Sequence, residues 1–198
     1  MTTRPARLVC MISGGGRTVL NLQDAIDRGE LDAEIALVIA SRDCPGVPRC
    51  EERRLETRIV PGDIDTRTLE TLLRGYRADL VCLAGYLRLL PVPEGWRGRI
   101  LNIHPALLPK FGGPSMFGDR VHRAVLKAGE TESGCTVHIC DDRYDTGPVI
   151  LQRRCPVKPD DTIETLAARV FEQECIAYPE AIRIALSRPD AEPEEPDA

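Results

Sequence analysis

An amide side chain and an imidazole stand two residues apart in the segment Leu101-Asn102-Ile103-His104-Pro105. In an extended strand, residues i and i+2 point to the same face, so Asn102 and His104 can approach one reacting atom. Because imidazole titrates near neutral pH, His104 can donate a hydrogen bond or a proton there. Pro105 disfavours a helical His104, so we expect the strand to end where this polar pair emerges. The segment therefore predicts a functional site.

The glycine-rich run Ser13-Gly14-Gly15-Gly16-Arg17-Thr18 is a second candidate site. It lies between an apolar segment, residues 7–12, and a helical pattern over residues 19–27 for which Thr18 is the expected N-cap. In such a strand–loop–helix unit, exposed N–H groups and the helix dipole bind anions. The run matches neither the Walker A loop nor the G-x-G-x-x-G dinucleotide motif. A tight turn that needs glycine for positive φ stays open as the alternative.

The elements that position these two sites are predicted from the apolar spacing. Strands are expected at residues 7–12, 33–40, 58–60, 79–84 and 99–104, and helices at 19–27, 48–56 and 65–76. This alternation is typical of an α/β fold with a Rossmann-like open, mostly parallel twisted sheet and helices on both faces. Ligands bind beyond the carboxyl ends of such strands, so we expect the loops at 14–16, 85–90 and 102–104 to converge.

The C-terminal part of the chain has a different pattern. A loop rich in glycine and proline over residues 110–118 precedes a helix at 119–127, with Asp119 as its cap. The segments 133–140 and 149–157 are expected strands that can pair as an antiparallel hairpin, and residues 162–186 form a long helical pattern. Residues 187–198 are acidic and almost free of apolar residues, so we expect a disordered tail. Residues 1–186 are interpreted as one catalytic domain.

The composition excludes several classes of function. The net charge of −5 argues against a general binder of nucleic acid or of an anionic membrane surface. No apolar run approaches the roughly 18 residues of a membrane span, and the first apolar run is too short for a signal peptide, so we expect a cytoplasmic protein. The eight cysteines lack zinc spacing, which predicts reduced, mostly buried thiols and no metal site.

Five groups of residues in a fixed order give the chain a family resemblance. They are Ile12-Ser-Gly-Gly-Gly16, Leu83-Ala-Gly-Tyr-Leu-Arg-Leu-Leu90, Asn102-Ile-His-Pro-Ala-Leu-Leu-Pro109, Gly134-Cys-Thr-Val-His-Ile139 with Asp145-Thr-Gly-Pro-Val-Ile-Leu-Gln152, and Gln173-Glu174 with Tyr178-Pro179. With these groups, residues 7–185 resemble the folate-dependent phosphoribosylglycinamide formyltransferase family of purine synthesis. Each group alone is a weak signal, whereas all five in order are specific.

The resemblance implies transfer of a formyl group from 10-formyltetrahydrofolate, a co-substrate, to the amine of 5-phosphoribosylglycinamide, with no metal required. Attack of the amine gives a tetrahedral oxyanion, which calls for a positioned donor such as the Asn102 amide. His104 would donate a hydrogen bond or a proton. Asp145 would orient or charge that imidazole and relay the proton of the amine. The alternative is an Asp145 that only caps the turn before Gly147.

The resemblance also implies which residues bind the substrates. The phosphate of the ribonucleotide would lie on the glycine loop, at Gly14, Gly15, Gly16, Arg17 and Thr18, and Glu174 would approach its ribose or phosphate. The pteridine would contact backbone groups of Leu87, Arg88, Leu89 and Leu90 as well as Asn102, and Arg67 falls where the family has a folate-contacting arginine. For Arg67 and for the side chain of Arg88, an ordinary solvated helix residue stays open as the alternative.

Two further histidines have weaker signals. His138 lies within a predicted strand and is interpreted as structural. His122, at the start of a predicted helix, stays open between packing and substrate contact.

The chain departs from the family pattern near the amine substrate. The glycine loop continues with Arg17 and Thr18 where the family has small polar residues and then Asn, and Arg17 can add a charge-assisted phosphate contact. The loop after Pro109 is longer than usual, with residues 113–118 inserted. Formyltetrahydrofolate deformylase and a non-catalytic folate- or phosphate-binding module are therefore the alternatives. The expected partners are small molecules, and monomer and homodimer both stay open.

Overall fold

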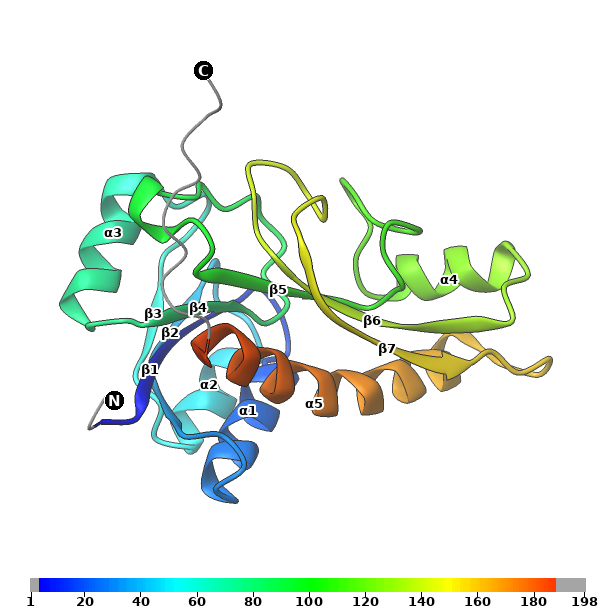
Figure 1. Cartoon of the computed structure of the whole chain (residues 1–198), viewed down its shortest axis with the longest axis horizontal. Helices are drawn as coiled ribbons and strands as arrows, with labels where there is room; N and C mark the ends of the chain where they lie inside the picture. The colour runs from blue at the N-terminus through cyan, green and yellow to red at the C-terminus, as the bar shows by residue number, and fades with distance from the viewer. Residues whose placement is uncertain (1–3, 188–198) are drawn as a thin grey trace.

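The computed structural model describes residues 4–187, in which one seven-stranded sheet has helices on both faces (Figure 1). The strands are β1 (Ala6–Ile12), β2 (Ala33–Ala40), β3 (Thr57–Ile59), β4 (Leu80–Leu83), β5 (Ile100–His104), β6 (Glu132–Ile139) and β7 (Val149–Pro156). Their order in the sheet is β3-β2-β1-β4-β5-β6-β7. β1 to β5 are parallel, β6 is antiparallel to β5, and β7 is antiparallel to β6. The predicted Rossmann-like sheet with an antiparallel C-terminal part is confirmed.

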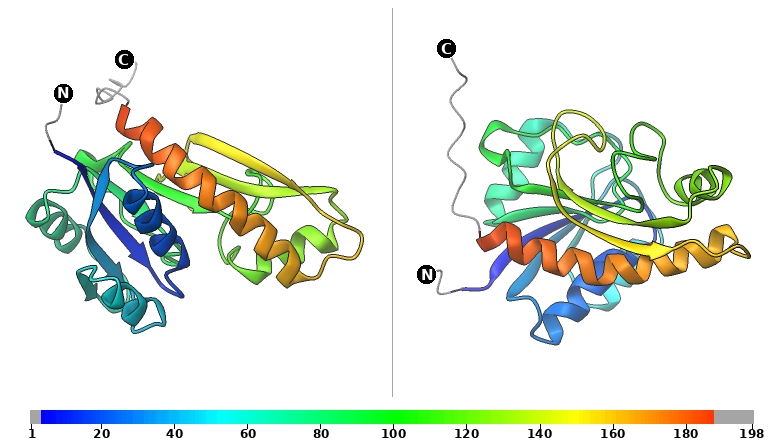
Figure 2. Two further views of the ribbon diagram at one scale, coloured as in Figure 1. Left: turned by 90° about the horizontal axis from the view of Figure 1, so that it is seen from below. Right: turned by 45° about the vertical axis from the view of Figure 1, so that its right-hand side comes forward.

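The helices cover the sheet in two groups. They are α1 (Arg17–Asp27), α2 (Gly46–Glu52), α3 (Thr66–Gly75), the 3-10 helix η1 (Glu94–Trp96), α4 (Asp119–Lys127) and α5 (Ile163–Ser187). α1, α2 and α5 pack on one face, α3 and η1 pack on the other, and α4 packs against α5 (Figure 2). No helix within residues 4–187 is both long and apolar enough to cross a membrane.

Side-chain alternation along β1 explains why both faces need a cover. Leu8, Cys10 and Ile12 point into the core beneath α1 and α5, whereas Val9 and Met11 point into the core beneath α3. All five side chains are fully buried. The eight cysteines of the chain are free and six of them are buried, which confirms the expectation of mostly buried thiols. A strand at the centre of the sheet must therefore be apolar throughout, as the sequence of β1 is.

The functional loops leave this sheet at one edge. β1, β4 and β5 are neighbours, and the strand order reverses at β1, so the loops after these three strands meet at a topological switch point. The buried hydroxyl of Tyr178 in α5 fixes this edge, because it shares its proton between the carbonyl oxygens of Leu83 (3.0 Å) and Leu101 (3.1 Å). The ends of β4 and β5 are thus held together by one side chain.

Two helix caps differ from the sequence prediction. The N-cap of α1 is Gly16 rather than Thr18, because Gly16 adopts a left-handed backbone with φ of 72° and the helix begins directly at Arg17. The N-cap of α4 is Gly118 rather than Asp119, again with positive φ. At both sites a glycine loop feeds the chain straight into the helix, which leaves no place for the predicted polar cap.

Other element ends moved by a few residues. α2 spans Gly46–Glu52 rather than residues 48–56, because Arg54 has a φ of 58° and turns the chain toward β3. The N-cap of α3 is Asp65, which accepts a hydrogen bond from the Thr68 N–H at 2.9 Å. α5 includes Ser187, where the predicted tail began, and residues 188–198 lie outside the described residues.

Candidate active site

A cavity of about 360 Å³ opens at the carboxyl ends of β4 and β5. Its walls come from residues within the segments 83–90, 102–105, 113–118 and 138–145, together with Thr18 and Glu174. Asn102, His104 and Asp145, which the sequence placed in one catalytic set, all line it. The cavity is therefore the place where the strand-end pair and the distant Asp145 come together.

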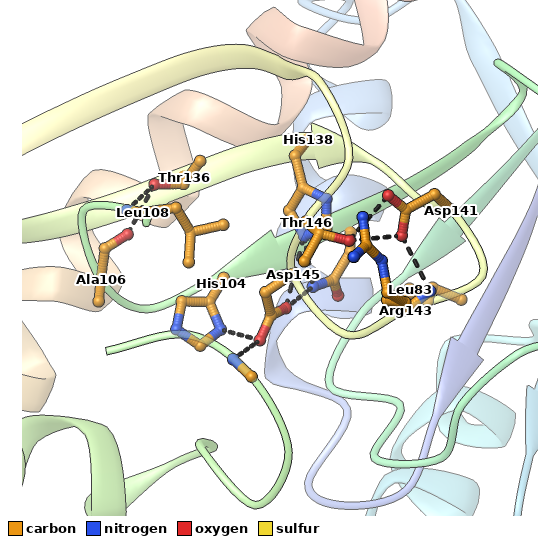
Figure 3. A network of polar contacts seen from close by, with 12 residues as sticks. Leu83, His104, Ala106, Leu108, Thr136, His138, Asp141, Arg143, Asp145 and Thr146 are labelled. Atoms are coloured by element: carbon orange, nitrogen blue, oxygen red, sulfur yellow. Dashed lines mark hydrogen bonds and ion pairs between the residues drawn. The ribbon is translucent and has the colours of Figure 1, made fainter. Parts of the chain in front are cut away.

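His104 is held in this wall by one ring nitrogen. The ring is only 3% exposed. Its Nε2 atom lies 2.8 Å from the carbonyl oxygen of Phe111. Because a carbonyl oxygen only accepts, Nε2 carries a proton and donates it, which leaves Nδ1 unprotonated in the neutral ring. Nδ1 lies 3.5 Å from Oδ2 of Asp145, so it is the ring nitrogen placed to exchange a proton (Figure 3).

Two N–H donors from separate segments hold the Asp145 carboxylate, and the ring of His138 lies beside it. Oδ2 accepts a hydrogen bond from the N–H of Gly113 at 2.9 Å. Oδ1 accepts one from Nδ2 of Asn102 at 3.3 Å and lies 3.5 Å from Nε2 of His138. The backbone of Asp145 is left-handed, with φ of 57°, a conformation that Asp tolerates better than most residues. The carboxylate thus joins β5, β6 and the loop after β5.

These contacts shift the pKa values of the pair. Burial lowers the pKa of His104, and the Asp145 carboxylate offsets this effect only in part. Burial raises the pKa of Asp145, but its contacts with His138, His104 and the Gly113 N–H outweigh burial and hold that pKa below its ordinary value. At neutral pH the pair is therefore a neutral imidazole beside an ionised carboxylate, which together can accept one proton.

The turn that carries Asp145 is braced by its neighbours. Oγ1 of Thr146 lies 2.8 Å from both carboxylate oxygens of Asp141, and the N–H of Arg143 donates to Oδ1 of Asp141 at 2.9 Å (Figure 3). Gly147 has no space for a side chain, because a Cβ atom there would lie 1.9 Å from the carbonyl oxygen of Ile139. Asp141 therefore stabilises the turn, which leaves the Asp145 carboxylate free to face the cavity.

His138 belongs to the site, although the sequence indicated a structural role. Antiparallel pairing of β5 and β6 places His138 directly opposite Asn102. Its Nδ1 atom donates to the carbonyl oxygen of Ile139 at 2.9 Å, so its Nε2 atom accepts from Nδ2 of Asn102 at 3.1 Å. Both hydrogens of the Asn102 amide are thus directed at partners, one at His138 and one at Asp145. The alternating spacing of β6 could have placed His138 on this face, but only the strand pairing identifies its partner.

The loop after His104 is fastened from the neighbouring strand. Oγ1 of the fully buried Thr136 donates to the carbonyl oxygen of Ala106 at 2.7 Å and accepts from the N–H of Leu108 at 3.0 Å. Gln152 of β7 donates to that same Oγ1 at 2.8 Å and to the Leu108 carbonyl oxygen at 2.9 Å. Figure 3 shows Thr136, Ala106 and Leu108 as one group, to the upper left of His104. This clamp positions the chain that brings the Phe111 carbonyl group to the imidazole.

The glycine loop forms a smaller hollow of about 210 Å³ that shares Thr18 and Gly85 with the main cavity. Residues 14–18 all line it. No side chain caps α1 and its first turn has no acidic residue, so the N–H groups of that turn can receive an anion. The structure therefore places the predicted phosphate residues beside the catalytic set.

The glycine loop owes its shape to a neighbouring glycine and two arginines. Gly46 packs so closely that a Cβ atom there would lie 2.6 Å from the carbonyl oxygen of Gly14. Arg42 donates to the carbonyl oxygen of Ser13 at 2.9 Å, and Arg49 donates to that of Gly15 at 3.0 Å. The carbonyl groups of the loop are thus occupied by cations on its outer side.

Arg17 lines the smaller hollow, and Glu174 lines the main cavity beside it. The guanidinium carbon of Arg17 lies 3.8 Å from the centroid of the Phe171 ring in α5. Glu174, one turn further along α5, lines the main cavity. Burial raises the pKa of Glu174 to about 7, although the Arg17 charge acts in the opposite direction. The cavity therefore contains a carboxyl group that exchanges a proton near neutral pH.

Residues 87–90, the segment predicted to bind the pteridine, form another wall of the main cavity, the leucine wall. The side chains of Leu87 and Leu89 are 37% and 43% exposed, while Leu90 is buried. The N–H of Leu87 donates to Oγ of Ser13 at 3.0 Å, which joins this segment to the start of the glycine loop. Arg88 points outward to an exposed ion pair with Asp63, at 2.8 Å, as the solvated alternative predicted.

Arg67 does not line the main cavity. Its side chain is exposed in the first turn of α3. A shallow groove beside the cavity is lined by residues 63–66 and 87–91, and Arg67 follows the first of these segments directly. Arg67 itself lines neither the cavity nor this groove, so its predicted folate contact stays a prediction.

Similarity to known proteins agrees with this arrangement. A family model described as formyl transferase matches residues 6–182. The chain belongs to the formyl transferase family. The crystal structure of glycinamide ribonucleotide transformylase 1 from Symbiobacterium toebii is 36% identical with a TM-score of 0.84, covering 94% of this chain and 91% of that chain.

The chain is also similar to two further proteins. The chloroplastic phosphoribosylglycinamide formyltransferase of Vigna unguiculata is 36% identical over 92% of this chain, which spans 61% of that protein. A formyltetrahydrofolate deformylase from Pseudomonas syringae is 25% identical with a TM-score of 0.80, over 91% of this chain and 61% of that chain. The resemblance inferred from the sequence motifs is thereby confirmed. The chain spans about three fifths of the length of the plant relative.

Proposed function

We propose that this formyl transferase moves the formyl group of 10-formyltetrahydrofolate to the amine of 5-phosphoribosylglycinamide, a step of purine biosynthesis. The observation that carries the proposal is the position of Asn102, His104 and Asp145 between a glycine loop suited to a phosphate and a leucine wall suited to a pteridine. The names of the relatives, phosphoribosylglycinamide formyltransferase and glycinamide ribonucleotide transformylase, support the same substrates.

The leucine wall fits a flat heteroaromatic ring. A pteridine needs apolar contacts on its faces and hydrogen-bonding groups at its edge. Leu87 and Leu90 offer the apolar contacts, and within residues 4–187 the backbone groups of residues 88–90 form no hydrogen bond with another residue. Those backbone groups can therefore bind the pteridine edge.

The glycine loop fits the phosphate of the amine substrate. The uncapped first turn of α1 supplies N–H groups, and the Arg17 guanidinium supplies a positive charge at the rim of the hollow. Glu174 and Thr18 lie between this hollow and the catalytic set, where hydroxyl groups of a ribose would pass. The amine would then point toward His104 and Asp145.

The reaction forms one bond and breaks one. The amine nitrogen attacks the formyl carbon, a C–N bond forms, and the formyl oxygen becomes an oxyanion. Asn102 would stabilise that charge by turning one N–H from Asp145, its longer contact at 3.3 Å, toward the oxyanion. When the oxyanion collapses, the bond between the formyl carbon and N10 of the folate breaks.

One proton must travel from the attacking nitrogen to N10. In His104 the Nε2 proton is held by the Phe111 carbonyl group, so Nδ1 accepts the travelling proton. The resulting imidazolium is stabilised by the Asp145 carboxylate 3.5 Å away. Donation of this proton from Nδ1 to N10 restores the neutral ring and releases tetrahydrofolate.

A single incubation tests the proposal. Purified protein receives 10-formyltetrahydrofolate with and without 5-phosphoribosylglycinamide, and release of tetrahydrofolate and of formate is followed. We expect tetrahydrofolate release that depends on the ribonucleotide, without formate. Formate release that ignores the ribonucleotide would instead identify a deformylase, and binding of both ligands without turnover would identify a binding module. A His104→Ala variant controls for a contaminating enzyme.

The compartment and the oligomeric state stay predictions. We infer a cytoplasmic protein, as a monomer or a homodimer, from the sequence alone. The relative from Vigna unguiculata carries the word chloroplastic in its name, which concerns that protein. Fractionation of the source cells and light scattering of the purified protein test the two predictions.

A further inference from the structure

Arg17 differs from the other arginines around the glycine loop in what it contacts. Arg42 and Arg49 donate to carbonyl oxygens of the loop and so help to hold its shape. Arg17 forms no hydrogen bond or ion pair with another residue among residues 4–187, and its guanidinium group lies over the ring of Phe171 at 3.8 Å. The five N–H groups of Arg17 are therefore unused by the protein.

The stack between Arg17 and Phe171 forms part of the loop hollow. Both residues line the hollow of about 210 Å³ together with Gly14, Gly15 and Gly16. An aromatic ring attracts a guanidinium group through the face of the cation. The N–H groups at the edge of the cation then stay free to bind an anion in two parallel hydrogen bonds. Phe171 can thus fix the position of the charge without consuming its donors.

A competing partner for Arg17 lies close by. Glu174 follows Phe171 by three residues and so lies on the same side of α5. The two side chains interact electrostatically, because the charge of Arg17 lowers the pKa of Glu174 against the effect of burial. Without the ring, the long side chain of Arg17 would be free to move toward that carboxyl group and away from the loop. The ring of Phe171 keeps the cation at the rim of the hollow.

We propose that Phe171 is a positioning residue that holds Arg17 over the glycine loop, so that the pair selects an amine substrate carrying a phosphate. The identity of the substrate rests on the proposed function, whereas the role of Phe171 rests on the stack between Arg17 and Phe171. Phe171 touches the guanidinium group and acts through it. α1 has no side-chain cap. A phosphate dianion would bind its free N–H groups and the guanidinium group of Arg17 together.

Kinetics of single variants test the role of Phe171. We expect Phe171→Leu to raise the KM for 5-phosphoribosylglycinamide about two- to fivefold, the range of an exposed cation–π contact. The kcat and the KM for 10-formyltetrahydrofolate should change less than twofold. Phe171→Tyr should restore the KM, because it keeps the ring. Ile176→Ala, an exposed apolar residue of the same helix, is the matched control and should leave all constants unchanged.

A double-mutant cycle separates positioning from general damage to α5. Arg17→Ala should raise the KM for the ribonucleotide about tenfold or more, as expected for loss of a charge-assisted contact. If Phe171 acts through Arg17, adding Phe171→Leu to Arg17→Ala should change the KM no further. Effects of the two substitutions that multiply would overturn the proposal, as would an equal rise in the KM for the folate.

Binding of inorganic phosphate makes the test independent of formyl transfer. Calorimetry of the full chain with inorganic phosphate should give weaker binding for Phe171→Leu and for Arg17→Ala than for the wild type and Ile176→Ala. Unchanged phosphate binding in both variants would refute the role of the pair. If phosphate binding follows the expected order while no formyl group is transferred, the proposed function fails and the role of Phe171 stands.

Discussion

The Nδ1 atom of His104 lies 3.5 Å from the Oδ2 atom of Asp145, and these side chains are only 3% and 8% exposed. Since the Phe111 carbonyl oxygen accepts from Nε2 at 2.8 Å, the bare Nδ1 faces the carboxylate. A proton that arrives at Nδ1 therefore creates an ion pair in a site nearly closed to water, where the attraction between opposite charges is strong. The proposed proton transfer to His104 therefore depends on the carboxylate of Asp145.

Asp145→Asn should lower kcat at least about a hundredfold, the usual scale for a group in proton transfer, because an amide cannot stabilise the imidazolium. Asn also tolerates the left-handed backbone of residue 145, so the fold should persist. Steady-state kinetics and circular dichroism check both points. Asp160→Asn, an exposed carboxylate before α5, is the control. Turnover of Asp145→Asn within tenfold of the wild type would contradict the assigned role.

The buried His104 should favour the unfolded state in acid. The pKa of His104 is lowered by burial in the folded state, so the unfolded state binds more protons once the pH falls below about 6.5. The contribution of His104 to the free energy of unfolding should therefore decrease as the pH falls from 7.5 to 5.5. Asp145 adds nothing in this window, because its lowered pKa lies further toward acid. Urea unfolding at the two pH values measures this as a difference: on going from pH 7.5 to 5.5, the wild type should lose stability relative to His104→Gln. A difference between the two proteins that does not change with pH would contradict the prediction.

Glu174 should have the opposite effect on stability. Burial raises its pKa to about 7 in the folded state, against about 4.3 in an unfolded chain, so the folded state binds more protons between these values. The contribution of Glu174 to the free energy of unfolding should fall as the pH rises through this window. Glu174→Gln removes the effect, and at pH 8 relative to pH 4.5 it should gain up to about 3 kcal/mol over the wild type. Urea unfolding measures the gain, and exposed Glu172→Gln should show none.

The sequence predicted the fold and the Asn102–His104 pair for identifiable physical reasons, whereas Asp145 was predicted from the family resemblance. Continuous apolar segments indicated a sheet covered on both faces, and the i, i+2 spacing placed Asn102 and His104 on one side of β5. The contact of His138 with Asn102 could not be predicted, because it depends on the antiparallel pairing of β5 with β6. The carbonyl group that fixes the ring of His104 comes from Phe111, and a backbone contact of this kind leaves no trace in side-chain types.

The glycine loop shows a similar limit. A run of three glycines indicated an anion site, yet the sequence pointed to Thr18 as the helix cap, because a polar residue before a helical pattern is the usual signal. In the structure the left-handed Gly16 takes that position. The stack of Arg17 on Phe171 joins residues from α1 and α5, so no local pattern could predict it.

Gly46→Ala should damage the glycine loop. A Cβ atom there would lie 2.6 Å from the Gly14 carbonyl oxygen and 2.9 Å from the Gly16 nitrogen, so the backbone of the loop has to move. We expect a loss of roughly 1–3 kcal/mol in the free energy of unfolding and a higher KM for the phosphate-bearing substrate. Gly75→Ala, at the open C-terminal end of α3, has nothing within 4 Å and should be neutral or slightly stabilising. Equal behaviour of the two variants in thermal unfolding would refute the expected clash.

Gly112→Ala should displace the catalytic carboxylate rather than the phosphate site. A Cβ atom at residue 112 would lie 3.2 Å from Cβ of Asp145 and 2.6 Å from Cδ2 of Leu108. Leu108 can adjust its side chain, whereas Asp145 can yield only by moving the carboxylate that the neighbouring Gly113 N–H holds at 2.9 Å. Because reacting groups depend on sub-ångström placement, we expect kcat to fall about tenfold or more while both KM values change little.

The control for this substitution is Gly95→Ala in η1, which has nothing within 4 Å and no positive φ. It should leave kcat unchanged. The pH dependence of kcat supplies a second measurement, because a carboxylate moved from His104 stabilises the imidazolium less. The pKa of His104 in Gly112→Ala, followed by NMR titration of the ring, should therefore be lower than in the wild type. A variant with reduced kcat and an unshifted His104 titration would show that Gly112 acts on the loop alone, not through the pair.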